Sequence, residues 1–259
     1  MGRALLGGWL DQGVSAGDIT VVEPDPAAAK AAADAYGVNS ITSLDDFDDG
    51  VSPATVVFAV KPQVMDDVVP AYAKFATGET QFLSIAAGKT IAYFEEKLGS
   101  SAAIIRAMPN SPAAVGRAIT VACANANTSA EQKRCSGELL EAVGAVAWID
   151  DETLMDAVTA VSGSGPAYVF LLAECLAEAG VAQGLPAGLS RQLARATVAG
   201  AGELLHQATE PADRLRENVT SPGGTTQAAL EILMAEDGLQ ALLEKAVAKA
   251  TKRSRELAG

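Results

Sequence analysis

The stretch Ser221-Pro222-Gly223-Gly224-Thr225-Thr226 combines residue types suited to holding a small anion. Pro222 fixes its own φ angle, and the two glycines permit unusual backbone angles or the close approach of a ligand. The pattern from Gln227 onward predicts a helix, so the loop precedes a helix N-terminus with unpaired N–H groups and a positive dipole end. A carboxylate or phosphate would suit that end. A loop with a threonine N-cap is the simpler interpretation, and this stretch alone favours it.

Strands and helices alternate in the N-terminal half, which is the part of the chain where a second ligand would bind. This alternation predicts a Rossmann-like doubly wound sheet in a dinucleotide-binding domain, residues 1–150. Ligands of such sheets bind at the carboxyl ends of the strands. Strands are predicted at 19–22, 55–60, 81–85, 103–106, 117–123 and 146–149, and helices at 2–13, 26–36, 63–75, 90–98 and 129–143.

The first element of that fold is missing from the pattern. A dinucleotide fold begins with a strand and a Gly-x-Gly-x-x-Gly turn, whereas this sequence begins at the following helix. Met1-Gly2 matches only the last two positions of that turn. The sequence therefore predicts a truncated or mis-started chain, with a break in the sheet where the first strand would lie.

Residues at the predicted strand ends are candidates for contact with a dinucleotide. Glu23 lies about twenty residues past Gly2, where an acid accepts hydrogen bonds from the adenosine ribose and repels a 2′-phosphate. A solvated acid before a turn is an equally good interpretation. Lys61-Pro62 is either a cofactor flank or a plain strand exit, and Ala86-Ala87-Gly88 is either a surface for a flat ligand or a tight turn.

The C-terminal half, residues 151–259, is predicted to be helical throughout. Many small residues lie between Leu189 and Leu205, which indicates either a close contact between subunits or simple packing within the chain. Helices are predicted at 151–161, 165–183, 186–207, 210–219, 224–235 and 238–257.

Composition excludes several classes of partner. The net charge of −13 disfavours nucleic acid and anionic membranes. No apolar run approaches the roughly 20 residues that a membrane span needs, so we expect a cytoplasmic protein. The three separated cysteines fit reduced, buried thiols of a cytoplasmic protein, and no cluster of residues suggests a metal site. His206 is the single histidine, which argues against a Ser-His-Asp hydrolase.

Taken together, the motifs resemble the pyrroline-5-carboxylate reductase family, and they cover essentially the whole chain in order. Val161–Phe170 and the loop Ser221–Thr226 are the most specific of them, whereas the N-terminal piece is weak without its glycines. The matching segments are 1–8, 59–62, 84–88, 105–112, 161–170 and 221–226.

The resemblance implies hydride transfer from NADPH or NADH to the C=N bond of Δ1-pyrroline-5-carboxylate, which gives L-proline. Thr226 would be the catalytic group that hydrogen-bonds the ring nitrogen, and backbone N–H groups around Ser221, Gly224 and Thr225 would hold the substrate carboxylate. The implied substrate-binding residues are Ser221, Gly223, Gly224, Thr225 and Asn218, and the implied cofactor-binding residues are Met1, Gly2, Glu23, Ala59, Val60, Lys61, Pro62, Ile85, Ala86 and Ala87.

The resemblance also implies a homodimer or a larger homo-oligomer, with helical domains that interlock and a site shared between two subunits. Most members favour NADPH, whereas Glu23 favours NADH or mixed use, so the choice of cofactor stays open at this point. Two other functions also remain. One is a related imine or hydroxyacid reductase, although residues 165–183 lack the lysine expected of the hydroxyacid enzymes. The other is a non-catalytic dinucleotide-binding regulator.

Overall fold

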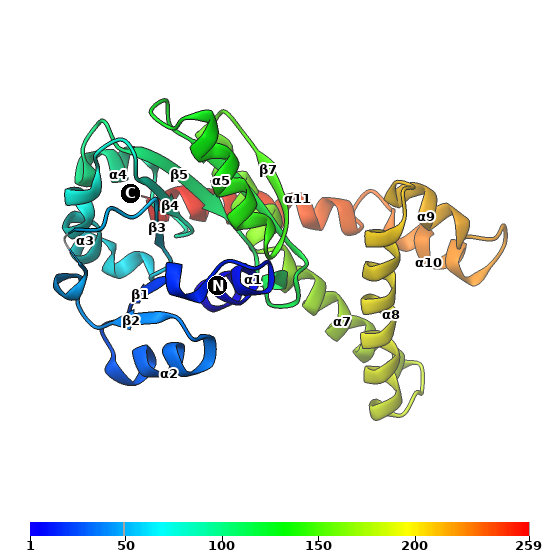
Figure 1. The fold of residues 1–259 in the computed structure, drawn as a ribbon. Coiled ribbons are helices and arrows are strands. Elements are labelled where there is room, and N and C mark those ends of the chain that lie inside the picture. The colour runs from blue at the N-terminus through cyan, green and yellow to red at the C-terminus, as the bar shows by residue number, and fades with distance from the viewer. Residues whose placement is uncertain (49, 259) are drawn as a thin grey trace. The chain divides into compact units, whose positions relative to one another are not determined.

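The computed structural model describes residues 1–48 and 50–258 (Figure 1). The chain forms two compact units, of which the first comprises Met1–Gly163 with Thr251–Gly259 and the second comprises Ser164–Ala250. The path therefore leaves the first unit once and returns to it near the C-terminus. The division into domains at residue 150 stays a prediction.

Seven strands of the first unit form two separate sheets. All neighbouring strands are parallel except β5 and β6, which are antiparallel. Within the described chain no ladder joins β1 to β3, and the predicted break in the sheet lies at this point. The first sheet pairs β1 (Thr20–Val22) with β2 (Asn39–Ile41), and the second has the order β3 (Thr55–Phe58), β4 (Gln81–Ser84), β5 (Ala103–Met108), β6 (Ala118–Ala124), β7 (Gly144–Trp148).

Helices of the first unit start and stop at the signals that local chemistry supplies. Asp25 caps the second helix, which Gly37 ends in the left-handed region with φ 69°. A reciprocal capping box between Ser129 and Gln132 starts the fifth. The helices are α1 (Gly2–Asp11), α2 (Pro26–Tyr36), α3 (Met65–Val68), α4 (Ile91–Leu98), α5 (Ala130–Glu141) and α6 (Met155–Val158).

Three details differ from the sequence-based expectation. Strand β2 was missed because Asn39-Ser40-Ile41 is short and mostly polar. The helix expected at 63–75 is instead the single turn α3 between 3₁₀ segments, since Pro70 lacks the N–H that a continuous helix needs. Strand β6 runs antiparallel to β5, whereas the predicted doubly wound sheet is mostly parallel.

The larger sheet is buried on both faces. All four residues of β4 are buried, and successive side chains point to opposite faces. Phe82 belongs to a cluster with Phe58 and Phe94, whereas Leu83 belongs to a cluster with Leu5. The helices that cover the sheet therefore close two cores around one layer of strands.

Polar contacts fix the segment around Glu152 and α6 to the rest of the first unit. The guanidinium of buried Arg106 pairs with Glu152 at 2.7 Å, and Glu152 also accepts the Ile91 N–H at 2.9 Å. The hydroxyl of Ser254 donates to Asp156 at 2.7 Å, and Arg255 lies 3.7 Å from the same carboxylate. The end of the last helix is thereby fixed to α6.

The second unit consists of helices alone. Helices α7 and α8 approach closely at Gly180, where an added Cβ would lie 2.2 Å from the Ser190 Oγ atom. That hydroxyl donates to the Ala177 carbonyl at 2.5 Å. The helices are α7 (Gly165–Ala182), α8 (Ala187–Gln207), α9 (Ala212–Asn218), α10 (Thr225–Leu233) and α11 (Leu239–Ala258), whose last residues belong to the first unit.

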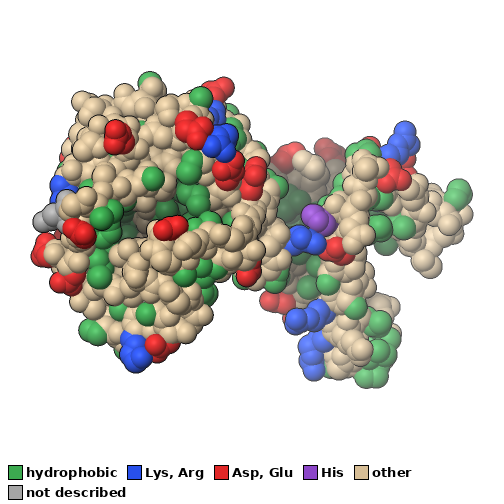
Figure 2. Space-filling view, viewed as in Figure 1, with side chains coloured by type: hydrophobic (Ala, Val, Ile, Leu, Met, Phe, Trp, Pro, Cys, Tyr) green, Lys and Arg blue, Asp and Glu red, His purple; other side chains and the backbone are tan. Residues whose placement is uncertain are grey.

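The expectation that no apolar run approaches membrane-spanning length was wrong for one segment. The continuous helical run Glu152–Ala182 is long and apolar enough for a span by length and composition, and only 11% of its most apolar part is buried. In α7, Glu174 and Glu178 interrupt an otherwise apolar helix. Figure 2 shows exposed apolar side chains over the helices of this unit. The chain by itself thus leaves much of α7 uncovered.

Candidate functional site

The loop before α10 has the geometry of an anion-binding turn. Gly223 has φ 70°, a value that side chains other than glycine rarely adopt, and Gly224 is the N-cap with no side-chain cap. The Gly224 N–H donates to the Ser221 carbonyl at 3.0 Å and closes the turn. One of the N–H groups predicted to hold the substrate carboxylate, that of Gly224, therefore already donates to a carbonyl within the turn.

The first turn of α10 supplies the remaining donors. Thr225, Thr226 and Gln227 are its first three residues, so their N–H groups have no carbonyl partner within the helix. The threonine N-cap considered from the sequence is absent, since both threonines lie inside the helix. Thr226 is half-buried, and Ser221, Thr225 and Asn218 are exposed. This end can hold a carboxylate, with the Thr226 hydroxyl beside it.

Gln227 fixes the shape of the loop, a role that the sequence reasoning missed. Its side-chain oxygen accepts the Gly223 N–H at 2.7 Å. The contact resembles a capping box, in which a Gln at the third helical position reaches back over the N-terminus. A Gln at the start of the predicted helix, four residues after Gly223, was the available signal.

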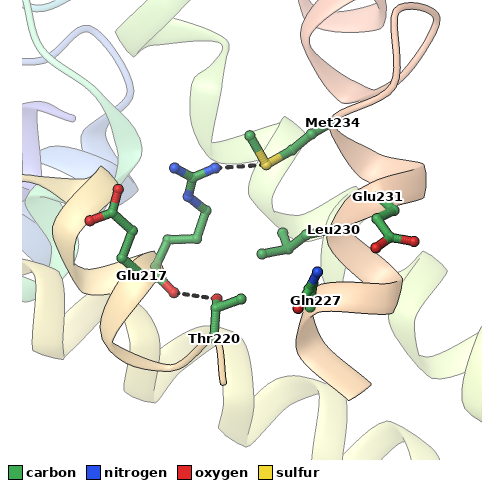
Figure 3. A pocket seen from close by; sticks show the side chains of 7 residues that line it. Glu217, Thr220, Gln227, Leu230, Glu231 and Met234 are labelled. Atoms are coloured by element: carbon green, nitrogen blue, oxygen red, sulfur yellow. Dashed lines mark hydrogen bonds between the residues drawn. The ribbon is translucent and has the colours of Figure 1, made fainter. Parts of the chain in front are cut away.

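A pocket of about 390 Å³ lies between α9 and α10, on the other side of Gln227 (Figure 3). The Thr220 hydroxyl donates to the Arg216 carbonyl at 2.6 Å, and Arg216 contacts the Met234 sulfur at 2.7 Å. The pocket is therefore a gap between the side chains of α9 and α10, and its lining does not include the predicted substrate-binding residues. Its lining is Arg216, Glu217, Thr220, Gln227, Leu230, Glu231 and Met234.

The predicted cofactor residues lie in the first unit, at the carboxyl ends of its strands. A Cβ added to Gly2 would lie 3.2 Å from the Cβ of Ala59, so the start of α1 and the end of β3 are in contact there. The Gly2 and Arg3 N–H groups have no acceptor within α1, because the helical bonds begin with Ala4 and Leu5 donating to Met1. These donors fit a pyrophosphate group.

The ends of β3 and β4 offer a partly exposed surface. Val60 and Lys61 are exposed after β3, Ile85 and Ala86 follow β4, and Ala87 is exposed beside them. Pro62 starts the 3₁₀ turn that leads away from β3. Ala86 is buried, so the predicted contact with the flat rings of a dinucleotide falls to the exposed Ala87 and the side chains beside it.

Asn110 of the motif at the end of β5 has a structural role. It is buried, accepts the Ile119 N–H at 3.1 Å, and donates to the Ser162 carbonyl at 3.2 Å. Ser162 belongs to a π-helical turn, Thr159–Gly163, that precedes α7. Among the described residues no group of three or more potential metal ligands is found.

A strand-end surface for a dinucleotide and a separate helix N-terminus for an anion define an oxidoreductase of the nicotinamide-dinucleotide class. The family model described as "NADP oxidoreductase coenzyme F420-dependent" matches residues 1–88. The model described as "Pyrroline-5-carboxylate reductase dimerisation" matches residues 152–257.

Comparison with individual proteins is more specific. The chain is 42% identical to the pyrroline-5-carboxylate reductase of Pseudomonas aeruginosa over 100% of its length and 93% of the relative. The corresponding structure from Coxiella burnetii superposes with a TM-score of 0.92 at 32% identity, covering 100% of this chain and 95% of that one. The Plasmodium falciparum structure with NADP bound has a TM-score of 0.81 at 29% identity, with coverage of 100% and 95%. The chain belongs to the pyrroline-5-carboxylate reductase family of NAD(P)H-dependent oxidoreductases.

Proposed function

We propose that this protein reduces Δ1-pyrroline-5-carboxylate to L-proline, with NADPH or NADH as the hydride donor. The observation that carries the proposal is the start of α10, where the first three helical residues, Thr226 among them, have N–H groups without a helical acceptor. The substrate has two polar features, a carboxylate and a ring nitrogen, and this end offers one kind of partner for each.

The carboxylate is held by the N–H groups of the first turn of α10. Oriented backbone donors and the positive end of the helix dipole favour a negative charge there. Gly223 allows the turn, and the tether from Gln227 keeps it in place. The ring is thereby positioned before any chemistry occurs, and such positioning contributes several kcal/mol, up to about 7–11 in ideal cases.

Thr226 orients the imine. When bound, the reduced nicotinamide supplies a hydride that adds to the C=N carbon, and the nitrogen of the iminium becomes the neutral amine of proline. Because the positive charge on nitrogen falls during this step, a hydroxyl that hydrogen-bonds the ring nitrogen serves better than a strong base. The N-terminal N–H groups of α1 and the surface around Ala59 and Ala87 would hold the cofactor.

A homodimer fits the exposed surface of the helical unit. Gly200 and Gly202 have no atom within 4 Å of a built Cβ, so these two glycines of α8 do not serve packing within the chain. A contact between subunits would give them a role. We further propose a cytoplasmic location and a place in proline biosynthesis.

The Thr226→Ala substitution tests the assignment. We expect turnover to fall about 10–100-fold, in the range of one lost hydrogen bond to a charged group, while NADH and NADPH titrations stay unchanged. Thr226→Ser should recover most of the activity, and Thr209→Ala is the matched control at an exposed threonine outside this loop. Unchanged turnover in Thr226→Ala would remove this residue from the mechanism. Proline-dependent reduction of NAD⁺ or NADP⁺ at alkaline pH excludes a hydroxyacid reductase and a regulator.

A further inference from the structure

The turn that follows β1 has the wrong chemistry for the 2′-phosphate of NADPH. It comprises Glu23, Pro24, Asp25 and Pro26, and it lies at the carboxyl end of a parallel strand. In a dinucleotide fold this strand end faces the adenosine ribose. That ribose is where NADH and NADPH differ, since NADH has a 2′-hydroxyl and NADPH has a 2′-phosphate with a charge near −2.

Every backbone donor of this turn is already used or missing. The Glu23 N–H donates to the Ile41 carbonyl at 3.0 Å. The Asp25 N–H donates to the Glu23 carboxylate at 3.1 Å, and the Ala27 N–H donates to the Asp25 carboxylate at 3.0 Å. The two prolines have no N–H. From Glu23 to Ala27 the chain therefore offers a phosphate no backbone donor, although the turn starts a helix.

The positive charge that a phosphate needs is also missing nearby in the sequence. Between Arg3 and Lys61, the sequence contains nine acidic residues and one basic residue, Lys30. The Lys30 ammonium group is 2.7 Å from the Asp34 carboxylate, and Asp34 lies further along α2 from Asp25 than Lys30 does. Because this ammonium group is already paired with a carboxylate, it attracts a phosphate less strongly than an unpaired ammonium group would.

The Glu23 carboxylate is well placed to accept hydrogen bonds instead. One oxygen receives the Asp25 N–H, which fixes the side chain, and an ionised carboxylate has about four acceptor positions in all. Glu23 is half-buried, so its interaction with a bound ribose is less screened than that of a fully exposed acid. A ribose hydroxyl can donate to it, whereas a 2′-phosphate brings two more negative charges against it.

We infer that this enzyme discriminates in favour of NADH, with Glu23 as the residue that determines cofactor specificity and the self-capped Asp25 as its support. The inference rests on the proposed function for the chemistry, but it concerns binding alone. It sets this chain apart from the Plasmodium falciparum relative, whose structure has NADP bound.

The test is a calorimetric titration of the full chain with NADH and NADPH, and with AMP and adenosine 2′,5′-bisphosphate, which differ from each other only by the 2′-phosphate. We expect NADH to bind about tenfold tighter or more than NADPH, from the repulsion of charges a few ångströms apart in water. Raising the salt concentration should narrow the difference. Equal affinity, tighter NADPH binding or no binding of either dinucleotide overturns the inference.

Variants locate the effect. Glu23→Ser should lower the NADH-to-NADPH preference about tenfold, and Glu23→Gln, which keeps an acceptor for the Asp25 N–H, should do the same without disturbing the turn. Asp18→Asn removes an equal charge near the opposite end of the same strand and should leave the preference unchanged. If the Glu23 variants keep the wild-type preference, Glu23 is not the determinant.

A parallel assay separates this inference from the proposed function. Reduction of pyrroline carboxylate with a preference for NADPH would leave the function standing and overturn the specificity. A clear binding preference for NADH without turnover of this substrate with either cofactor would support the specificity and overturn the function.

Discussion

The two units of the chain differ in where their apolar residues lie. The first unit buries large side chains, including Phe82, Phe94 and Ile104, around its sheet. Among residues 164–250, all of which the structure describes, Ala177 and Ala194 are the only buried apolar residues, while Phe170 is 62% exposed. One unit is therefore stable through its own core, and the other needs a second copy to cover it.

Replacing Phe170 with Glu should have the largest effect. Burial of a Phe contributes about 1.5–3 kcal/mol per subunit, and an unpaired buried carboxylate adds a further cost. We expect monomers and no activity, as measured by analytical ultracentrifugation and turnover. Val51→Glu, at a position 49% exposed in the first unit, is the control and should leave the dimer intact. A fully dimeric Phe170→Glu enzyme would contradict the comparison.

Replacing Phe94 with Ala tests the opposite unit. Phe94 is fully buried and stacks with Phe58 at a centroid distance of 5.5 Å. The cavity should cost about 3–5 kcal/mol of stability. We expect calorimetry to show that this loss does not vary with protein concentration, whereas the unfolding of the helical unit shifts with concentration as mass action requires. A loss that varies with concentration in the same way would mean that both units depend on assembly.

The smallest expected effect is a difference in alkylation rate between Cys123 in the first unit and Cys175 in the second. Burial raises the pKa of Cys123 in the first unit above its usual value, and the nearby Glu152 adds to this effect. Because the thiolate is the reactive form, we expect Cys123 to resist alkylation between pH 7 and 9. Exposed Cys175 on α7 should react slowly in the dimer and quickly in the Phe170→Glu monomer, as followed by mass spectrometry. Equal rates in the two forms would place Cys175 outside the interface.

The same contrast explains how much of the molecule the sequence could predict. Helix ends with caps, such as Asp25 and Gly37, and strands with a run of apolar residues, such as β3, carry local signals and were predicted within a few residues. The direction of β6 and the pairing of the short strand β2 depend on contacts far apart in the sequence. No residue pattern specifies those contacts on its own.

The candidate site divides in the same way. Gly223, Gly224 and the start of α10 were identified from residue types alone, because glycine and a helix N-terminus have local consequences. The tether from Gln227 and the use of the Gly224 N–H within the turn depend on exact loop geometry. Likewise, the sequence showed an acid at Glu23, whereas the occupied donors around it became visible only in the structure.

The hydrogen bond between Ser254 and Asp156 has a consequence for the history of the molecule. It ties the segment before residue 164 to the segment after residue 250, so the helical unit is an insert carried between two anchored ends. A segment held at both ends in this way can be exchanged for another while the first unit stays the same. Grafting residues 164–250 of a relative between these ends is therefore a practical route to chimeric enzymes with new partners or substrates.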